Sequence, residues 1–89
     1  MNQEIRNLLT EIEQMMQEFD EISWAKAFAR LATEYEEDSE IASGKIIALY
    51  GGMGSFNDIV FFRDGKVVAE ENERLDSLRK RLYELCRMN

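Results

Sequence analysis

The side chains best suited to chemistry gather in one glycine-rich loop. It comprises Gly51, Gly52, Met53, Gly54, Ser55, Phe56, Asn57 and Asp58. Backbone N–H groups of such a loop can cradle a phosphate, and a serine near an aspartate can hydrolyse a substrate when a histidine serves as base. The chain has no histidine. We therefore expect Ser55, Asn57 and Asp58 to bond to local backbone, and at least one glycine to have a positive φ.

A phosphate site in this loop is disfavoured by its place in the chain. The loop is expected to run from a helix into a strand, which puts the negative end of the helix beside it. It also lacks the Lys-Ser/Thr pair that ends nucleotide-binding loops. A tight turn after a helix C-terminus is the favoured interpretation.

The only cysteine, Cys86, has no second cysteine or histidine to activate it or to share a metal. We expect a small core residue, and no internal disulfide can form, as is usual in a reducing cytoplasm. The first residues are polar and acidic, which predicts no signal peptide, and no stretch is long and apolar enough to cross a membrane. We expect no catalytic residue, no metal and no cofactor, and hence no enzyme.

Acidic residues are concentrated in the first half of the chain. Residues 1–42 contain 11 acids and 3 bases, whereas residues 43–89 contain 7 acids and 8 bases, for a net charge of −7. The candidate partner-binding residues are Glu11, Glu18, Glu34, Glu36, Glu37, Asp38 and Glu40. They lack the alternating carboxylates and the glycine of a calcium loop. This charge disfavours nucleic acid and would attract a basic protein, although a merely solvated face explains it equally simply.

The elements that must position these residues follow from periodicity and caps. Apolar residues at steps of three and four predict helices over about 3–18 and 22–36, the second one carrying Trp24 toward the core. Ser39 is expected to cap a third helix, which ends at the glycine pair. The letters NDIVFF and KVVAE predict two strands that turn at Asp64-Gly65, and Asn72 is expected to cap a final helix with a leucine stripe.

The chain is therefore expected to be one α+β domain over residues 1–89. Three N-terminal helices precede one β-hairpin at about residues 57–70, and a C-terminal helix follows it. A lone hairpin is marginal in water, so helices should cover one of its faces. Alternation does not decide which face, because Ile59 and Phe61 oppose Val60 and Phe62.

The segment LYGGMGSFNDIVF, from Leu49, resembles a family of small bacterial proteins of uncharacterised function. In that family a Tyr-Gly-Gly-Met-Gly-Ser-Phe-Asn-Asp motif joins a helix to a strand, and the resemblance covers about residues 41–85. Such proteins are similar in size and charge to immunity proteins encoded beside toxins. The resemblance implies no chemistry for individual residues.

Three hypotheses remain at the level of sequence. The first is a small acidic protein-binding module, most concretely an immunity protein or antitoxin that covers a basic toxin domain such as a nuclease. The second is a small-ligand or nucleotide-related enzyme that uses the loop from Gly51 to Asp58. The third is a homo-oligomeric subunit, such as a homodimer, with Phe61 or Phe62 buried between protomers.

Overall fold

The computed structural model describes residues 2–51 and 54–88, and four helices make up most of them. In chain order they are α1 (Gln3–Glu18), α2 (Ile22–Glu37), α3 (Ser39–Ala48) and α4 (Ala69–Arg87). A short 3₁₀ turn, η1 (Phe56–Asp58), and two strands, β1 (Phe62–Arg63) and β2 (Lys66–Val67), lie between α3 and α4. The expected α+β class is confirmed, with three N-terminal helices, a hairpin and a C-terminal helix.

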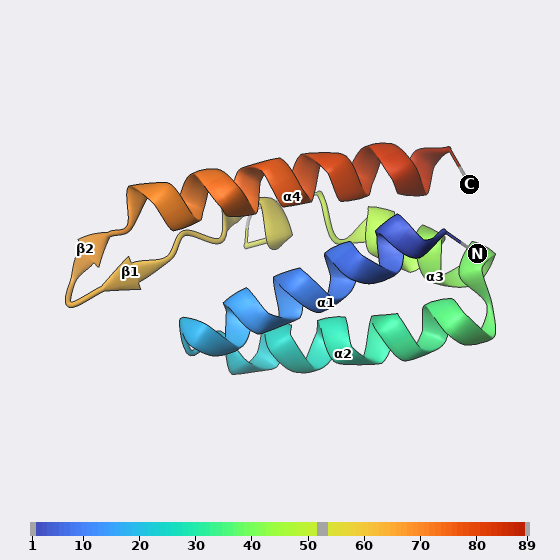
Figure 1. Cartoon of the computed structure of the whole chain (residues 1–89), viewed down its shortest axis with the longest axis horizontal. Coiled ribbons are helices and arrows are strands. Elements are labelled where there is room, and N and C mark those ends of the chain that lie inside the picture. The colour runs from blue at the N-terminus through green and yellow to red at the C-terminus, as the bar shows by residue number, and fades with distance from the viewer. Residues whose placement is uncertain (1, 52–53, 89) are drawn as a thin grey trace.

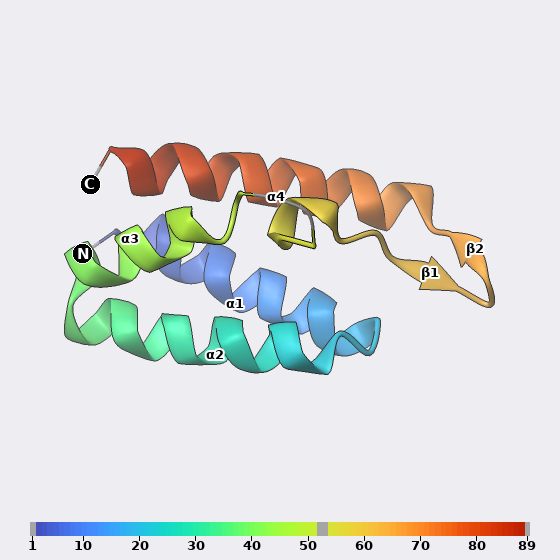
Figure 2. The same ribbon diagram turned by 180° about the vertical axis from the view of Figure 1, so that it is seen from behind.

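The long helices run along the long axis of a molecule that measures 39 × 22 × 19 Å. Figure 1 shows α1 between α2 and α4, and Figure 2 shows α3 and the segment after it lying along α4 on the other side. The hairpin extends beyond the helices at one end. The turn from α2 into α3 lies at the opposite end.

One hydrophobic core lies where the apolar faces of the helices meet. Each helix contributes apolar side chains to it, and the buried residues of α4 include Leu75, Leu78, Leu82 and Leu85. Ile59 and Phe61 are buried, whereas Val60 and Phe62 are exposed, so residues 59–62 turn their odd-numbered side chains inward. Trp24 is half-buried against this core, where its ring lies 5.7 Å from that of Phe56.

The hairpin turns at Asp64-Gly65 as expected, but its strands are much shorter. Phe62 pairs with Val67 and Arg63 pairs with Lys66. Both central residues have a positive φ, 54° at Asp64 and 78° at Gly65, which suits a two-residue turn between twisted strands. Before β1, Ile59 and Phe61 bond to side chains of α4, and after β2 that helix begins at Ala69, which limits the ladder to two pairs.

Two caps expected from the sequence are wrong. The third helix is capped by Asp38, whose carboxylate accepts a hydrogen bond from the Ile41 N–H at 3.1 Å, and Ser39 is already helical. The last helix begins at Ala69 after Val68, so Asn72 lies inside it. In both cases the helix begins earlier than the polar residue that was expected to start it.

Candidate functional site

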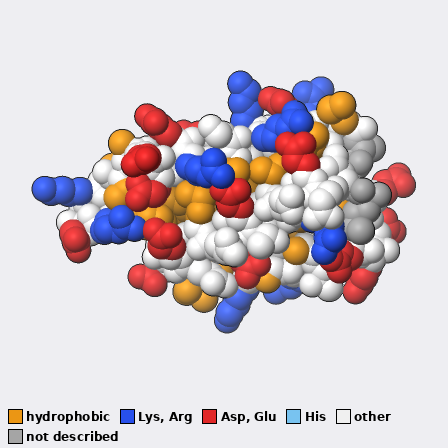
Figure 3. All heavy atoms as spheres, viewed as in Figure 1, with side chains coloured by type: hydrophobic (Ala, Val, Ile, Leu, Met, Phe, Trp, Pro, Cys, Tyr) orange, Lys and Arg blue, Asp and Glu red, His pale blue; other side chains and the backbone are white. Residues whose placement is uncertain are grey.

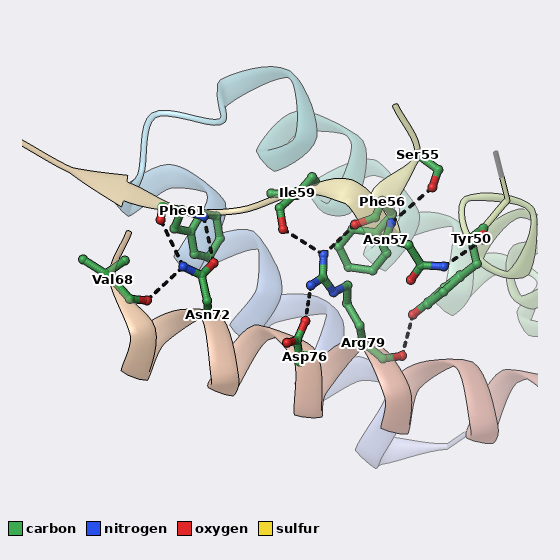
Figure 4. Close-up of polar contacts among 10 residues, drawn as sticks. All are labelled: Tyr50, Ser55, Phe56, Asn57, Ile59, Phe61, Val68, Asn72, Asp76 and Arg79. Carbon is green, nitrogen blue, oxygen red and sulfur yellow. Dashed lines mark hydrogen bonds and ion pairs between the residues drawn. The ribbon is translucent and has the colours of Figure 1, made fainter. Parts of the chain in front are cut away.

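The loop after α3 is fastened to α4 by a buried arginine. Arg79 is 8% exposed, and its Nη1 donates to the carbonyl oxygens of Phe56 at 2.7 Å and of Ile59 at 3.1 Å. Its Nη2 bonds to the carboxylate of Asp76 (Figure 4). A buried guanidinium is tolerated only when its donors are paired. The loop and the helix therefore hold each other in place.

Tyr50 and Asn57 close the same junction from the side of α3. The Tyr50 hydroxyl donates to the carbonyl of Arg79 at 2.8 Å, and the Asn57 amide donates to the carbonyl of Tyr50 at 2.9 Å (Figure 4). Burial raises the pKa of the Tyr50 phenol well above its ordinary value. The phenol therefore stays protonated at neutral pH and acts as a structural donor.

The polar residues of the glycine-rich loop bond to local backbone, as the sequence predicts. The Ser55 hydroxyl accepts from the Asn57 N–H at 3.3 Å, and the Asp58 carboxylate accepts from the Gly54 N–H at 2.6 Å. Gly54 has a φ of 76°, which confirms the expected positive φ. Because the Gly54 N–H already donates to the Asp58 carboxylate, that negative charge disfavours phosphate binding in this loop. Gly52 and Met53 lie outside the described residues.

A cleft of about 690 Å³ lies between this loop and α4. It is lined by Ile47, Tyr50, Gly51, Asn57, Asp76, Arg79, Lys80, Tyr83 and Glu84. The rings of Tyr50 and Tyr83 lie 4.9 Å apart. The two acids and two bases of the cleft balance, so its charge selects neither anions nor cations.

The structure does not bring Ser55, Asn57 and Asp58 into one cavity. Only Asn57 lines the cleft beside α4. Ser55 and Asp58 line a separate, smaller depression of about 450 Å³ that is bordered by Val60 and Phe62. The hydrolytic arrangement considered from the sequence is therefore not assembled.

The thiol of Cys86 is a core group, as expected. It is 2% exposed and hydrogen-bonds to Ser43. Burial raises the pKa of this thiol, which keeps it protonated at neutral pH. A protonated, inaccessible thiol is a poor nucleophile.

Most of the candidate acidic residues are paired with bases of the same chain. The pairs that involve them are Glu11 with Arg74, Glu18 with Arg63, Glu34 with Lys45, and Glu36 with Arg6. Figure 3 shows acidic and basic side chains side by side along the junction of α1 and α4. Because these negative charges are partly offset by bases of the same chain, fewer unpaired carboxylates remain in residues 1–42 to attract a partner.

The remaining candidates, Glu37, Asp38 and Glu40, lie where α2 meets α3. Together with Ile41 they are called the corner of α2 and α3. All three acids are exposed, and Ile41 is 59% exposed. Asp38 caps α3, while Glu37 and Glu40 form no ion pair with any residue in 2–51 or 54–88. The corner therefore presents an exposed apolar side chain that is close in sequence to three exposed carboxylates.

The structural roles of Asn72 and Arg79 were not predicted from the sequence. Both lie at helical spacing from Leu75 and Leu82, on the stripe that α4 buries. A polar side chain on a buried stripe needs hydrogen-bond partners, and this pattern in the sequence could have indicated the structural roles of both residues. The exposure of Ile41 was not predicted either, although this side chain is 59% exposed.

Comparison with known proteins adds a family but no activity. Residues 17–69 match the family described as a domain of unknown function, DUF6966. The match covers more than half of the chain and includes the glycine-rich loop, so the chain belongs to this family. No curated protein and no solved structure matches it.

Proposed function

We propose that this member of the DUF6966 family is a protein-binding module and not an enzyme. Most concretely, it is an immunity protein or antitoxin that works in the cytoplasm and neutralises a basic toxin domain, such as a nuclease, by direct binding. Among the described residues, none of the helices is both long and apolar enough to cross a membrane. Under this proposal the partner is also in the cytoplasm when it is bound.

The corner of α2 and α3 is the observation that carries this proposal. Interfaces commonly combine an apolar anchor with a polar rim that excludes water. Ile41 is the anchor here, and Glu37, Asp38 and Glu40 form the rim. Ile41 is exposed, whereas the opposite face of its helix packs on the core. Burying Ile41 on a partner would therefore contribute favourable free energy that folding of the single chain does not provide.

The charge of the corner favours a basic partner. Glu37 and Glu40 are not offset by a described base, and they stand in a chain whose net charge is −7. Clustered charges of one sign raise the association rate with an oppositely charged surface. The positive cleft of a nuclease is such a surface.

Two groups, one partly buried and one fully buried, support binding over chemistry. The phenol of Tyr50 and the thiol of Cys86 both have raised pKa values, because burial disfavours their charged forms. Each is therefore held in its less reactive state. Ser55 and Asp58 are used by the loop itself.

The cleft beside α4 favours a second candidate, small-ligand binding. Its volume of about 690 Å³ suits a drug-sized molecule, and the rings of Tyr50 and Tyr83 give it an apolar wall. A homo-oligomer remains the third proposal. Phe61 is only 1% exposed in the single chain, which leaves the exposed Phe62 as its contact residue.

The proposal is tested by isolating the partner and measuring how it binds. The immobilised chain is used to capture proteins from a lysate of the native host, and the partner is identified by mass spectrometry and then produced in pure form. Stopped-flow association is compared for wild type and for Glu37→Gln with Glu40→Gln, at low and high salt. We expect the variant to associate about tenfold more slowly at low salt, with the difference shrinking as salt rises.

The matched control is Glu13→Gln with Glu73→Gln, which removes the same charge away from the corner. It should slow association less than the corner variant. Ile41→Ser should instead raise the dissociation rate, because it removes the apolar anchor. If the corner and control variants slow association equally, the corner is not the recognition surface. A partner whose activity persists when it is saturated with the chain would remove the immunity role.

A further inference from the structure

We propose that the outward edge of residues 59–62, hereafter the strand edge, is a docking site for an extended segment of a partner protein that carries lysine or arginine. The segment would add to the hairpin as a further β-strand. This site goes beyond the proposed function, because it lies at the opposite end of the molecule from the corner of α2 and α3 (Figure 1).

The inner side of this segment is held extended by side chains of α4. The Asn72 carboxamide accepts from the Phe61 N–H at 2.7 Å and donates to the Phe61 carbonyl at 3.0 Å. These are the two hydrogen bonds that a residue of a neighbouring strand would make. Arg79 likewise donates a hydrogen bond to the carbonyl of Ile59 (Figure 4). The helix thus substitutes for a strand on the inner side.

The outer side is open. Backbone N–H and C=O groups alternate in direction along an extended chain, so those of Val60 and Phe62 point away from α4. The Val68 N–H bonds to the Phe61 carbonyl at 3.4 Å, and this makes the next pair, Phe62 with Val67, a non-hydrogen-bonded one. Within residues 2–51 and 54–88, the backbone of Val60 has no hydrogen-bond partner. Such an edge is a template for another strand.

The exposed side chains beside this edge suit strand addition. Val60, Phe62 and Val67 are 47%, 56% and 57% exposed, although each is apolar. Phe62 and Val67 are opposite each other in the hairpin and share one face. In strand addition, backbone hydrogen bonds supply affinity while alternate side chains of the peptide contact such a face.

Charge decides which occupant fits. The depression along the edge is lined by Val60, Phe62 and the carboxylates of Glu21 and Asp58. Arg63, at the far end of the edge, is already paired with Glu18 and Glu71. A second copy would bring the same carboxylates and another net charge of −7 to this contact. A segment with basic side chains is attracted instead.

The test uses a synthetic hexapeptide of alternating lysine and valine as the probe. It is titrated into the ¹⁵N-labelled full chain at low salt and followed by NMR. We expect the amide signals of Val60 and Phe62 to shift and their hydrogen exchange to slow. The same peptide with every backbone nitrogen methylated, and a glutamate-valine peptide, should both bind much more weakly.

Val60→Pro removes the outward backbone N–H. Val60→Thr keeps that N–H and replaces valine by a side chain of similar shape. Ile59 has a φ of −70° and a ψ of 128°, which a following proline accepts. We expect the proline variant to bind the peptide about five- to tenfold more weakly than the threonine variant. Circular dichroism shows whether the proline variant has folded. Glu21→Gln, compared with Glu13→Gln, gives a second comparison that does not alter the backbone.

Three results would overturn the inference. They are equal binding of the methylated peptide, equal binding by the proline and threonine variants when both are folded, and slowed exchange at Val60 that appears only as the chain itself dimerises. Glu37→Gln with Glu40→Gln should leave peptide binding unchanged. Failure of the strand edge is therefore distinguishable from failure of the corner.

Discussion

Replacing Arg79 by methionine removes the guanidinium that joins Phe56 and Ile59 to α4 but keeps most of the length of the side chain. Two of the lost bonds reach backbone carbonyls, those of Phe56 and Ile59, at 2.7 and 3.1 Å. A hydrogen bond to a charged group contributes about 1.5–3 kcal/mol, and an unpaired buried acceptor costs about 1–3 kcal/mol. Because the loop can relax and admit water, we expect a loss of about 3–5 kcal/mol rather than the full sum.

That loss is large for a chain of 89 residues, whose free energy of unfolding is about 4–13 kcal/mol at the usual value per residue. The ion pair of Arg79 contributes little of it, because the Asp76 side chain is 67% exposed. Asp76→Asn is therefore the matched control, with an expected loss of about 0–1 kcal/mol.

Urea unfolding, followed by far-ultraviolet circular dichroism, measures both variants. If Arg79→Met stays within about 0.5 kcal/mol of wild type, the typical range of a surface substitution, the two carbonyl bonds do not hold the loop. If Asp76→Asn is as destabilising as Arg79→Met, the ion pair is the main fastening and the reasoning from burial is wrong.

Three further outcomes follow from single groups. Gly54→Ala should lose about 1–2 kcal/mol because its φ is 76°, whereas Gly51→Ala, whose new methyl group would meet no atom within 4 Å, should be close to neutral in the same urea assay. Cys86 should resist a disulfide-exchange reagent at pH 8 until urea is added, and fast labelling of the folded chain would contradict its burial. Arg81 lowers the pKa of Glu4 below its ordinary 4.5, so the stability that this pair supplies is present above that pH and is lost as the pH falls below it. Arg81→Gln should flatten this part of the stability profile, and parallel profiles for variant and wild type would count against the pair.

Local patterns were enough to predict the helices and the turn. The stripe of leucines in α4 and the Asp64-Gly65 turn each depend on neighbours a few residues away, and both are confirmed. The strands were overestimated because the residues around them bond to side chains of α4 instead of to each other. Asn72 was expected to be a cap because its actual partner, Phe61, lies 11 residues earlier and contacts it only in the folded chain.

The partial pairing of the acidic half depends on contacts between distant parts of the chain. Glu4 and Arg81 are separated by 77 residues, and Glu11 and Arg74 by 63. No window of sequence shows that α1 lies beside α4, so the charge of residues 1–42 was read as if it faced only solvent. The corner of α2 and α3 was within the predicted set, but the sequence did not separate it from the paired carboxylates.

Neutralisation is tested most directly by titrating the toxic activity of the purified partner with the chain. We predict that activity falls in proportion to added chain and is abolished at one equivalent. Glu37→Gln with Glu40→Gln and Ile41→Ser should need a clear excess, while Glu13→Gln with Glu73→Gln should follow wild type. Undiminished activity at several equivalents of wild type would contradict neutralisation, and identical titrations for all variants would contradict the corner of α2 and α3 as the surface responsible.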